Sequence, residues 1–242
     1  MNLPILSVIR KIVDKLYMLK KQYYRHKFKL ISLPLTAADL LRAGMRSNDS
    51  AILIDLIKPS PADKILYIGP GYYAEPLLAC AFYGATIDIV QPKTQNSVLG
   101  NTTYQTIELE HNIRSYYLLL NSIYGKNILR GKINTRKYEG YIQDSNFQSK
   151  YSLIFLLNVL DSGEAMYHFD EICSKLFDYT ETVASFIISA WEQKSLFVAR
   201  KVSAFAQGMG WKSFVFELYN PVNSIDFPHG VYRVLLVKNQ LL

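Results

Sequence analysis

The stretch Lys64-Ile65-Leu66-Tyr67-Ile68-Gly69-Pro70-Gly71 decides the fold. It begins as a short β-type run of apolar residues and ends in two glycines. Because glycine lacks a Cβ, the backbone there can turn sharply and approach a ligand closely. Residues 74–82 follow with a helical pattern of apolar side chains. The order of strand, glycine turn and helix is typical of the first unit of a parallel α/β sheet.

Strand-like and helix-like segments continue to alternate along the rest of the chain. The predicted strands span residues 64–68, 85–90, 138–143, 151–158, 183–190, 213–219 and 231–238. The predicted helices span residues 50–57, 74–82, 107–124, 164–177 and 193–207. No helix separates the last two strands, so they are expected to pair antiparallel. We therefore predict an α/β fold: a doubly wound, mainly parallel seven-stranded sheet with an antiparallel last strand, preceded by N-terminal helices.

Charge is concentrated at the N-terminus. The net charge is +7, and residues 1–30 carry eight Lys and Arg against Asp14 alone, so the rest of the chain is neutral. The body therefore has no net charge that would suggest nucleic-acid binding. Apolar residues make up 50% of the chain and charged ones 19%, which excludes disorder.

The basic N-terminal segment has the pattern of an amphipathic helix. Apolar residues recur every three or four positions over residues 5–19. Such a helix either packs on the body or lies on a membrane surface, and the pattern leaves both interpretations open for residues 1–30. Thr36 and Asp39 are predicted to cap the next helix. We divide the chain into a basic helical extension, residues 1–48, and a domain, residues 49–242.

Several features bear on the compartment and on metal binding. Cys80 and Cys173 lie in apolar helical segments and are expected to be reduced core residues. The four histidines and two cysteines show no metal-ligand spacing, so we expect no metal. Basic residues follow the first apolar run instead of preceding it, and we therefore expect no signal peptide. The expected location is cytoplasmic, with membrane-surface contact as the alternative for the N-terminal helix.

A ligand site is expected at the glycine loop. Open parallel sheets bind ligands beyond the carboxyl ends of their strands, near the point where the strand order reverses. The helix that follows Gly69-Pro70-Gly71 offers free N–H groups to a polar ligand. The alternative is a tight turn between strand and helix that binds nothing.

At this loop the chain resembles the class I S-adenosylmethionine-dependent methyltransferases, over about residues 50–242. The resemblance rests on the glycine loop, the strand 85–90, Gly140-Tyr141-Ile142-Gln143-Asp144-Ser145 as the third strand, residues 151–160 as the fourth, and the final strand pair. It implies S-adenosylmethionine as the cofactor. It places around that cofactor Tyr67, Gly69, Pro70, Gly71, Gln91, Asp144, Ser145 and Asn158.

The resemblance also implies a role for most of these residues. Gly69 and Gly71 would pass under the methionine part of the cofactor. Asp144, with Ser145 beside it, would accept a hydrogen bond from the adenine amino group. Asn158 would lie between cofactor and substrate.

The chain departs from the family pattern at two positions. Tyr67 stands where the family has an acid, two residues before the first glycine. Gln91 stands where an acid holds the ribose hydroxyls, and its amide is neutral. A degenerate, non-catalytic copy of the fold that binds a partner is therefore one alternative.

Methyl transfer to a small-molecule or lipid-like acceptor is the predicted activity. No Asn/Asp-Pro-Pro-Tyr/Phe segment follows the fourth strand, which argues against adenine, cytosine and glutamine-amide acceptors. The loop with Pro76 is also similar to that of nicotianamine-synthase-like enzymes, which transfer the aminocarboxypropyl group of the same cofactor. Gly69-x-Gly71-x-x-Ala74 formally fits a NAD(P)-dependent reductase, but the required acid and a downstream Tyr-x-x-x-Lys are missing.

Overall fold

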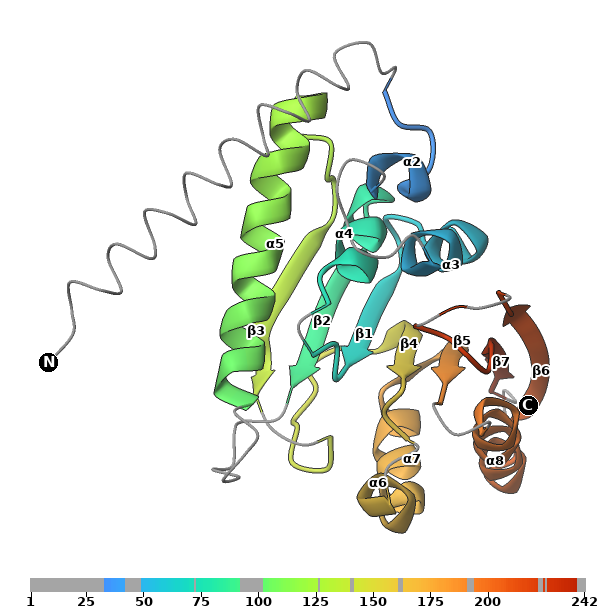
Figure 1. Cartoon of the computed structure of the whole chain (residues 1–242). Helices are drawn as coiled ribbons and strands as arrows, with labels where there is room; N and C mark the ends of the chain where they lie inside the picture. The colour runs from blue at the N-terminus through green and yellow to red at the C-terminus, as the bar shows by residue number, and fades with distance from the viewer. Residues whose placement is uncertain are drawn as a thin grey trace, which may run out of the picture.

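A seven-stranded sheet forms the centre of the computed structural model (Figure 1). The structure describes residues 33–41, 49–71, 73–91, 102–125, 127–139, 142–160, 163–190, 194–221, 224 and 226–238. The predicted helix over residues 5–19 and most of the extension 1–48 lie outside them. The strands are β1 (Lys64–Ile68), β2 (Thr86–Gln91), β3 (Lys132–Glu139), β4 (Tyr151–Leu157), β5 (Thr180–Ser189), β6 (Lys212–Tyr219) and β7 (Val231–Val237).

The sheet has the order β3-β2-β1-β4-β5-β7-β6. The first five strands pair in parallel, and β7 runs antiparallel to both of its neighbours. The predicted fold class is therefore confirmed. It is the architecture implied by the resemblance to class I methyltransferases.

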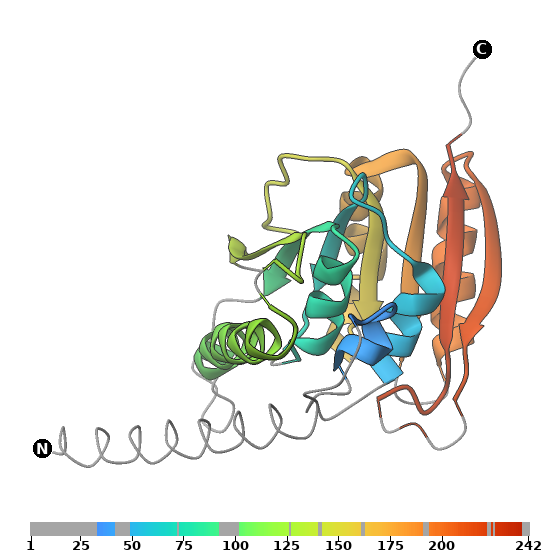
Figure 2. The ribbon, with the colours of Figure 1, turned by 90° about the horizontal axis from the view of Figure 1, so that it is seen from above.

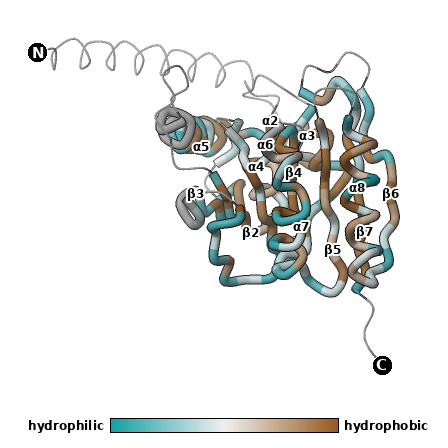
Figure 3. Tube along the Cα trace, turned by 90° about the horizontal axis from the view of Figure 1, so that it is seen from below, coloured by the Kyte–Doolittle hydropathy of each residue, from teal (hydrophilic) through white to brown (hydrophobic). Residues whose placement is uncertain are grey.

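Helices cover both faces of this sheet (Figure 2). One face carries α2 (Ala37–Leu41), α3 (Asp49–Ile57), α4 (Glu75–Phe82) and α5 (Thr102–Tyr124), and the other carries α6 (Gly163–Tyr167), α7 (Phe169–Asp178) and α8 (Ser195–Gly208). Each face of the sheet has its own hydrophobic core, and successive residues of a strand contribute to different ones. Ile65 and Phe155 lie in one buried cluster, and Leu66 and Ile154 lie in the other. Because both faces are buried, residues 65–68 of β1 and residues 153–157 of β4 are all apolar. Hydrophobic residues, brown in Figure 3, also predominate along the neighbouring β5.

The third strand lies earlier than the sequence predicted. β3 spans Lys132–Glu139, whereas the expected strand spanned residues 138–143, and residues 142–144 form a turn. β3 is an edge strand that pairs with β2 alone, so it needs few apolar residues and gives a weak hydrophobic signal. The predicted helix 164–177 is also divided at His168, giving α6 and α7.

The short helix α2 is fixed to α3 by hydrogen bonds. Asp39 N donates to Thr36 Oγ1 over 3.1 Å, which confirms the predicted capping role of Thr36. The first backbone N–H groups, of Ala37 and Ala38, donate to the carboxylate of Asp55 over 2.7 and 2.9 Å. A carboxylate at this place satisfies free N–H groups and complements the helix dipole.

Both cysteines are free and buried, as the sequence predicted. Cys80 and Cys173 lie in the two different core clusters, so the sheet separates them. Burial raises the pKa of the Cys173 thiol to about 12. No helix within the described residues combines the length and the apolar character needed to cross a membrane.

Candidate functional site

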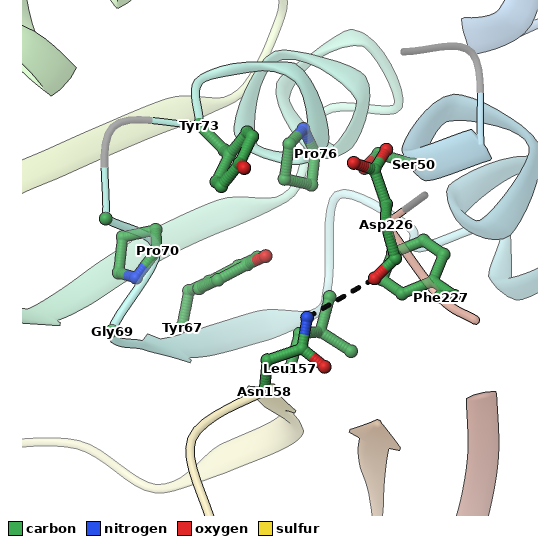
Figure 4. A pocket seen from close by; sticks show the side chains of 11 residues that line it. Ser50, Tyr67, Gly69, Pro70, Tyr73, Pro76, Leu157, Asn158, Asp226 and Phe227 are labelled. Carbon is green, nitrogen blue, oxygen red and sulfur yellow. Dashed lines mark hydrogen bonds between the residues drawn. The ribbon is translucent and has the colours of Figure 1, made fainter. Parts of the chain in front are cut away.

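A pocket of about 190 Å³ lies at the carboxyl ends of β1 and β4 (Figure 4). These neighbouring strands continue to opposite sides of the sheet, so this is the point where the strand order reverses. Backbone and side chains from four parts of the chain line the pocket: Ser50, Tyr67, Gly69, Pro70, Gly71, Tyr73, Pro76, Leu157, Asn158, Asp226 and Phe227.

The two loop glycines have the left-handed conformation that favours glycine. Their φ angles are 59° at Gly69 and 60° at Gly71. A Cβ at Gly69 would lie 3.2 Å from Cγ2 of Val159, whereas a Cβ at Gly71 would have no neighbour within 4 Å. Gly69 is therefore favoured by its conformation, and a Cβ there would require Val159 to shift, whereas Gly71 leaves open space beside the pocket.

Tyr67 supplies a neutral polar group where the family places an acid. Its ring is 4% exposed and stacks on Phe155, with ring centroids 5.2 Å apart and an interplanar angle of 7°. In Figure 4 its hydroxyl points toward the side of the pocket that holds Asp226. Burial raises the pKa of Tyr67 above its ordinary value of 10.0, and nearby charges add to the effect. The hydroxyl therefore stays protonated and can donate a hydrogen bond.

Asn158 joins the end of β4 to two other elements. It has a positive φ of 57°, which asparagine tolerates better than most residues. Its Oδ1 accepts a hydrogen bond from Ser189 Oγ at 2.9 Å, and its Nδ2 donates to the backbone oxygen of Asp226 at 3.3 Å. The amide thus holds the β6–β7 loop against the ends of β4 and β5.

The β6–β7 loop is also anchored by the first residue of α3. The carboxylate of Asp49 accepts hydrogen bonds from Tyr219 at 3.0 Å and from Ser224 at 2.6 Å. Ser224 Oγ in turn accepts the N–H of Phe227 at 3.0 Å. These bonds place Asp226 and the buried ring of Phe227 in the wall of the pocket.

Sequence reasoning missed Ser50, Asp226 and Phe227 as residues of this site. A usable signal was present, because a final strand that runs antiparallel returns from the same rim at which the parallel strands end. The loop before that strand must therefore lie at the ligand-binding rim. It contains an acid beside an aromatic residue, Asp226-Phe227.

The structure brings together five of the eight predicted cofactor residues as pocket lining: Tyr67, Gly69, Pro70, Gly71 and Asn158. Gln91 lies behind the loop, where its Nε2 donates to the backbone oxygen of Gly71 at 3.2 Å. Its buried Oε1 has no hydrogen-bond partner among the described residues. Asp144 is exposed and Ser145 is buried in a turn, and neither lines the pocket. A cofactor role for all eight residues stays a prediction.

No protein-family model and no curated protein sequence matches the chain. Solved structures of similar architecture include an S-adenosylmethionine-dependent methyltransferase of Methanosarcina mazei, with 10% identity, 74% of this chain and 93% of that one covered, and a TM-score of 0.48. A TehB-like methyltransferase of Corynebacterium glutamicum has 15% identity, 90% and 97% coverage, and a TM-score of 0.45. The N-methyltransferase NodS of Bradyrhizobium japonicum has 9% identity, 79% and 94% coverage, and a TM-score of 0.46. The fold of the chain is defined by its own strand order, independently of these similarities.

Proposed function

We propose that the chain binds S-adenosylmethionine in this pocket and transfers its methyl group to a small-molecule or lipid-like acceptor. One observation carries the proposal. The glycine loop that follows β1 and Asn158 at the end of β4 line a single pocket, at the point where the strand order reverses. The antiparallel β7 supports it further, because an all-parallel 3-2-1-4-5-6 sheet would instead favour a dinucleotide reductase.

The residues of the pocket fit the methionine end of this cofactor. The described walls enclose about 190 Å³, which is less than the roughly 300–1,000 Å³ of sites for whole drug-sized ligands. Gly71 leaves space for a close approach, and Tyr67 and Asn158 offer polar atoms. The buried Oε1 of Gln91, which has no partner among the described residues, is the acceptor that we assign to a ribose hydroxyl.

The chain would contribute positioning and exclusion of water. When bound, the cofactor supplies a methyl group on a positively charged sulfur. Aligning an acceptor with such a group lowers the barrier by roughly 7–11 kcal/mol without a dedicated catalytic side chain. The rings of Tyr67 and Phe227, both buried, form apolar walls that would keep water from the reacting atoms.

A non-catalytic partner-binding protein is the second candidate. The specific observation in its favour is that Tyr67 and Gln91 are both neutral where the family has acids. Losing both charges removes two strong hydrogen-bond acceptors for the cofactor.

Isothermal titration calorimetry on the full chain separates these candidates. We expect micromolar binding of S-adenosylmethionine and S-adenosylhomocysteine, and no binding of NAD. If neither S-adenosylmethionine nor S-adenosylhomocysteine gives a heat of binding at millimolar concentration, the proposal is overturned and the partner-binding protein is favoured. Heat with NAD alone would favour a reductase. If binding is found, incubation with a methyl-labelled cofactor and candidate acceptors tests transfer.

A further inference from the structure

One edge of the sheet, formed by β6, is open to pairing with another strand. β6 lies at the right-hand edge in Figure 1 and pairs with β7 alone. Among the described residues, its backbone forms no main-chain hydrogen bond besides those with β7. The outer N–H and C=O groups of such a strand form a template for a further strand.

The sequences of the two edge strands differ in charge. β3, at the opposite edge, reads Lys-Ile-Asn-Thr-Arg-Lys-Tyr-Glu, with three basic residues against one acid. An excess of one sign discourages a strand from pairing with its own copy and is a common protection of sheet edges. β6 reads Lys-Ser-Phe-Val-Phe-Glu-Leu-Tyr, with one base and one acid, and therefore lacks this protection.

Two aromatic rings are exposed on one face of β6. Phe214 and Phe216 are each 50% exposed, and their rings stack with centroids 6.5 Å apart. Ser213, between α8 and β6, has its hydroxyl 2.7 Å from that of Ser203 in α8. Because successive residues of a strand point to opposite faces, α8 covers the other face of β6 and leaves the two rings uncovered.

This apolar surface continues onto β7 and β5. Leu235 of β7 pairs with Phe214, and Val237 of β7 pairs with Val183 of β5. Directly opposed residues of antiparallel strands share a face of the sheet. Val183 is 55% exposed, and Leu235 and Val237 are partly exposed. We call Val183, Phe214, Phe216, Leu235 and Val237 the β6 strip. A contiguous exposed apolar surface beside an unpaired strand edge indicates an interaction site.

A second copy of the chain complements this edge. If two copies of β6 pair antiparallel about a two-fold axis at Val215, Phe214 of one copy lies opposite Phe216 of the other, and all four rings share one face. Ser213 then lies opposite Glu217, and no like charges oppose each other. The pairing uses only residues that precede the register shift between Glu217 and Tyr219.

We propose that two copies of this chain form a dimer through the edge of β6 and the β6 strip. The two half-exposed rings offer together roughly 150–250 Å² of ring surface. This is less than the about 800 Å² per partner of a standard interface, so the strand pairing supplies much of the rest and we expect micromolar dissociation.

The dimer leaves both pockets free. β6 runs parallel to the first five strands, because β7 is antiparallel to both β5 and β6. A two-fold axis reverses this direction, so the rims that hold the two pockets lie at opposite sides of the joined sheet. The inference therefore does not depend on the proposed function.

Sedimentation equilibrium of the full chain tests the oligomeric state. From low micromolar to near-millimolar concentration, the mass should rise from that of one chain to that of two and then stay constant, because a two-fold interface is closed. A monomer throughout, or growth beyond a dimer, would overturn the inference.

Charge substitutions locate the interface at the two rings. Phe214→Lys/Phe216→Lys and Phe214→Glu/Phe216→Glu should each weaken self-association about 30-fold or more, whereas an equimolar mixture of the two variants should form a dimer. Phe197→Lys is the control, at a ring of α8 that is 56% exposed, and should keep the wild-type dimer. No association in the mixture, or an equal loss in the control, would contradict the interface. Circular dichroism and urea unfolding establish that the variants fold.

A single cysteine on each edge strand identifies the edge that pairs. Val215→Cys places a thiol opposite its own copy, with Cβ atoms about 4.5–5.5 Å apart, so a short thiol-reactive reagent should cross-link two chains. The native Cys80 and Cys173 are buried and do not compete. Lys132→Cys, at the exposed start of β3, is the control and should stay uncross-linked. Cross-linking of the control alone would assign the interface to the other edge and overturn the inference.

Calorimetry with S-adenosylmethionine keeps this inference separate from the proposed function. A dimer that binds no S-adenosylmethionine would contradict the proposed function and leave the β6 interface supported. A chain that binds the cofactor but stays monomeric would overturn the interface alone.

Discussion

Ser224 Oγ donates a 2.6 Å hydrogen bond to Oδ2 of Asp49, across almost the whole length of the domain in sequence. Asp49 is the first residue of α3, and Ser224 belongs to the β6–β7 loop. The other carboxylate oxygen of Asp49 accepts the hydroxyl of Tyr219 at the end of β6. One side chain thus ties the start of the domain to the loop that carries Asp226 and Phe227 into the pocket.

Removing this tie should destabilise the fold and loosen the loop. Asp49→Ala is expected to cost about 1–3 kcal/mol of unfolding free energy, because it leaves two hydroxyl groups without their acceptor. Urea unfolding measures this loss. In a double-mutant cycle with Ser224→Ala, the two changes should be coupled by about 0.5–3 kcal/mol. Strict additivity would mean that the hydrogen bond contributes nothing.

The glycine at position 71 should matter to binding more than to stability. Gly71→Ala and Gly125→Ala form a matched pair, because both glycines have positive φ angles and open space around a Cβ. Each substitution is expected to cost about 1–2 kcal/mol of stability through left-handed strain. Only Gly71 lines the pocket, so only its substitution should weaken S-adenosylmethionine binding in calorimetry. Equal binding by the two variants would contradict a ligand at the loop.

The sequence predicted the elements whose hydrophobic signal is local and strong. β1 coincides with its predicted range of residues 64–68, since both of its faces are buried and four consecutive residues are apolar. The antiparallel ending followed from the missing helix between the last two strands. β3 was displaced because an edge strand with sequence Lys-Ile-Asn-Thr carries too few apolar residues to mark its start.

The pocket was predicted only on its glycine-loop side and at Asn158. Those residues follow strands directly, so the topology rule locates them. The antiparallel ending places the loop with Asp226 and Phe227 at this rim, but which of its residues enter the pocket wall depends on long-range contacts such as Asp49 with Ser224. No local pattern encodes these contacts or the place of Ser50. Gln91 was expected to face a ligand. Its Nε2 supports the backbone of Gly71, and a cofactor role for its Oε1 stays a prediction.

A buried polar network should hold β2, β3 and β4 together. Tyr151 OH donates to Asp88 Oδ2 at 2.9 Å and lies 3.1 Å from the hydroxyl of Tyr138, while Asn134 Nδ2 lies 2.6 Å from Asp88 Oδ1. Burial and its hydrogen bonds raise the pKa of Tyr151, so the hydroxyl remains a donor at neutral pH. Tyr151→Phe should cost about 1–3 kcal/mol of unfolding free energy, because it leaves the buried carboxylate short of a partner.

Tyr232→Phe is the control for this prediction. Tyr232 donates a hydrogen bond of 3.1 Å to Glu217, but the pair is exposed to solvent. Its loss should change the unfolding free energy by no more than about 0.5 kcal/mol. A cost for Tyr151→Phe as small as that for Tyr232→Phe would show that the network does not stabilise the sheet.

Asp63, just before β1, should make the free energy of unfolding depend on pH in the acidic range. Partial burial alone would raise its pKa, but hydrogen bonds from the N–H of Ser60, from the hydroxyl of Ser152 and from the hydroxyl of Ser60 lower it below the ordinary value of 3.8. Because the pKa is lower in the folded state than in the unfolded one, the ionised carboxylate stabilises the fold at pH values above 3.8. This stabilisation is lost as the pH falls through the folded-state pKa.

Asp63→Asn should therefore lower the midpoint of urea unfolding at pH 7 and have a much smaller effect at an acidic pH below the folded-state pKa of Asp63, where the wild-type carboxyl is protonated as well. Ser152→Ala removes one of the hydrogen bonds that favour the ionised form, so it should reduce the same pH dependence without abolishing it. Asp178→Asn, at an exposed carboxyl at the end of α7, serves as the control and should leave the pH dependence unchanged. A loss of stability for Asp63→Asn that is equal at both pH values would show that Asp63 acts through packing or local geometry, because a charge-dependent contribution must disappear when the carboxyl is neutral.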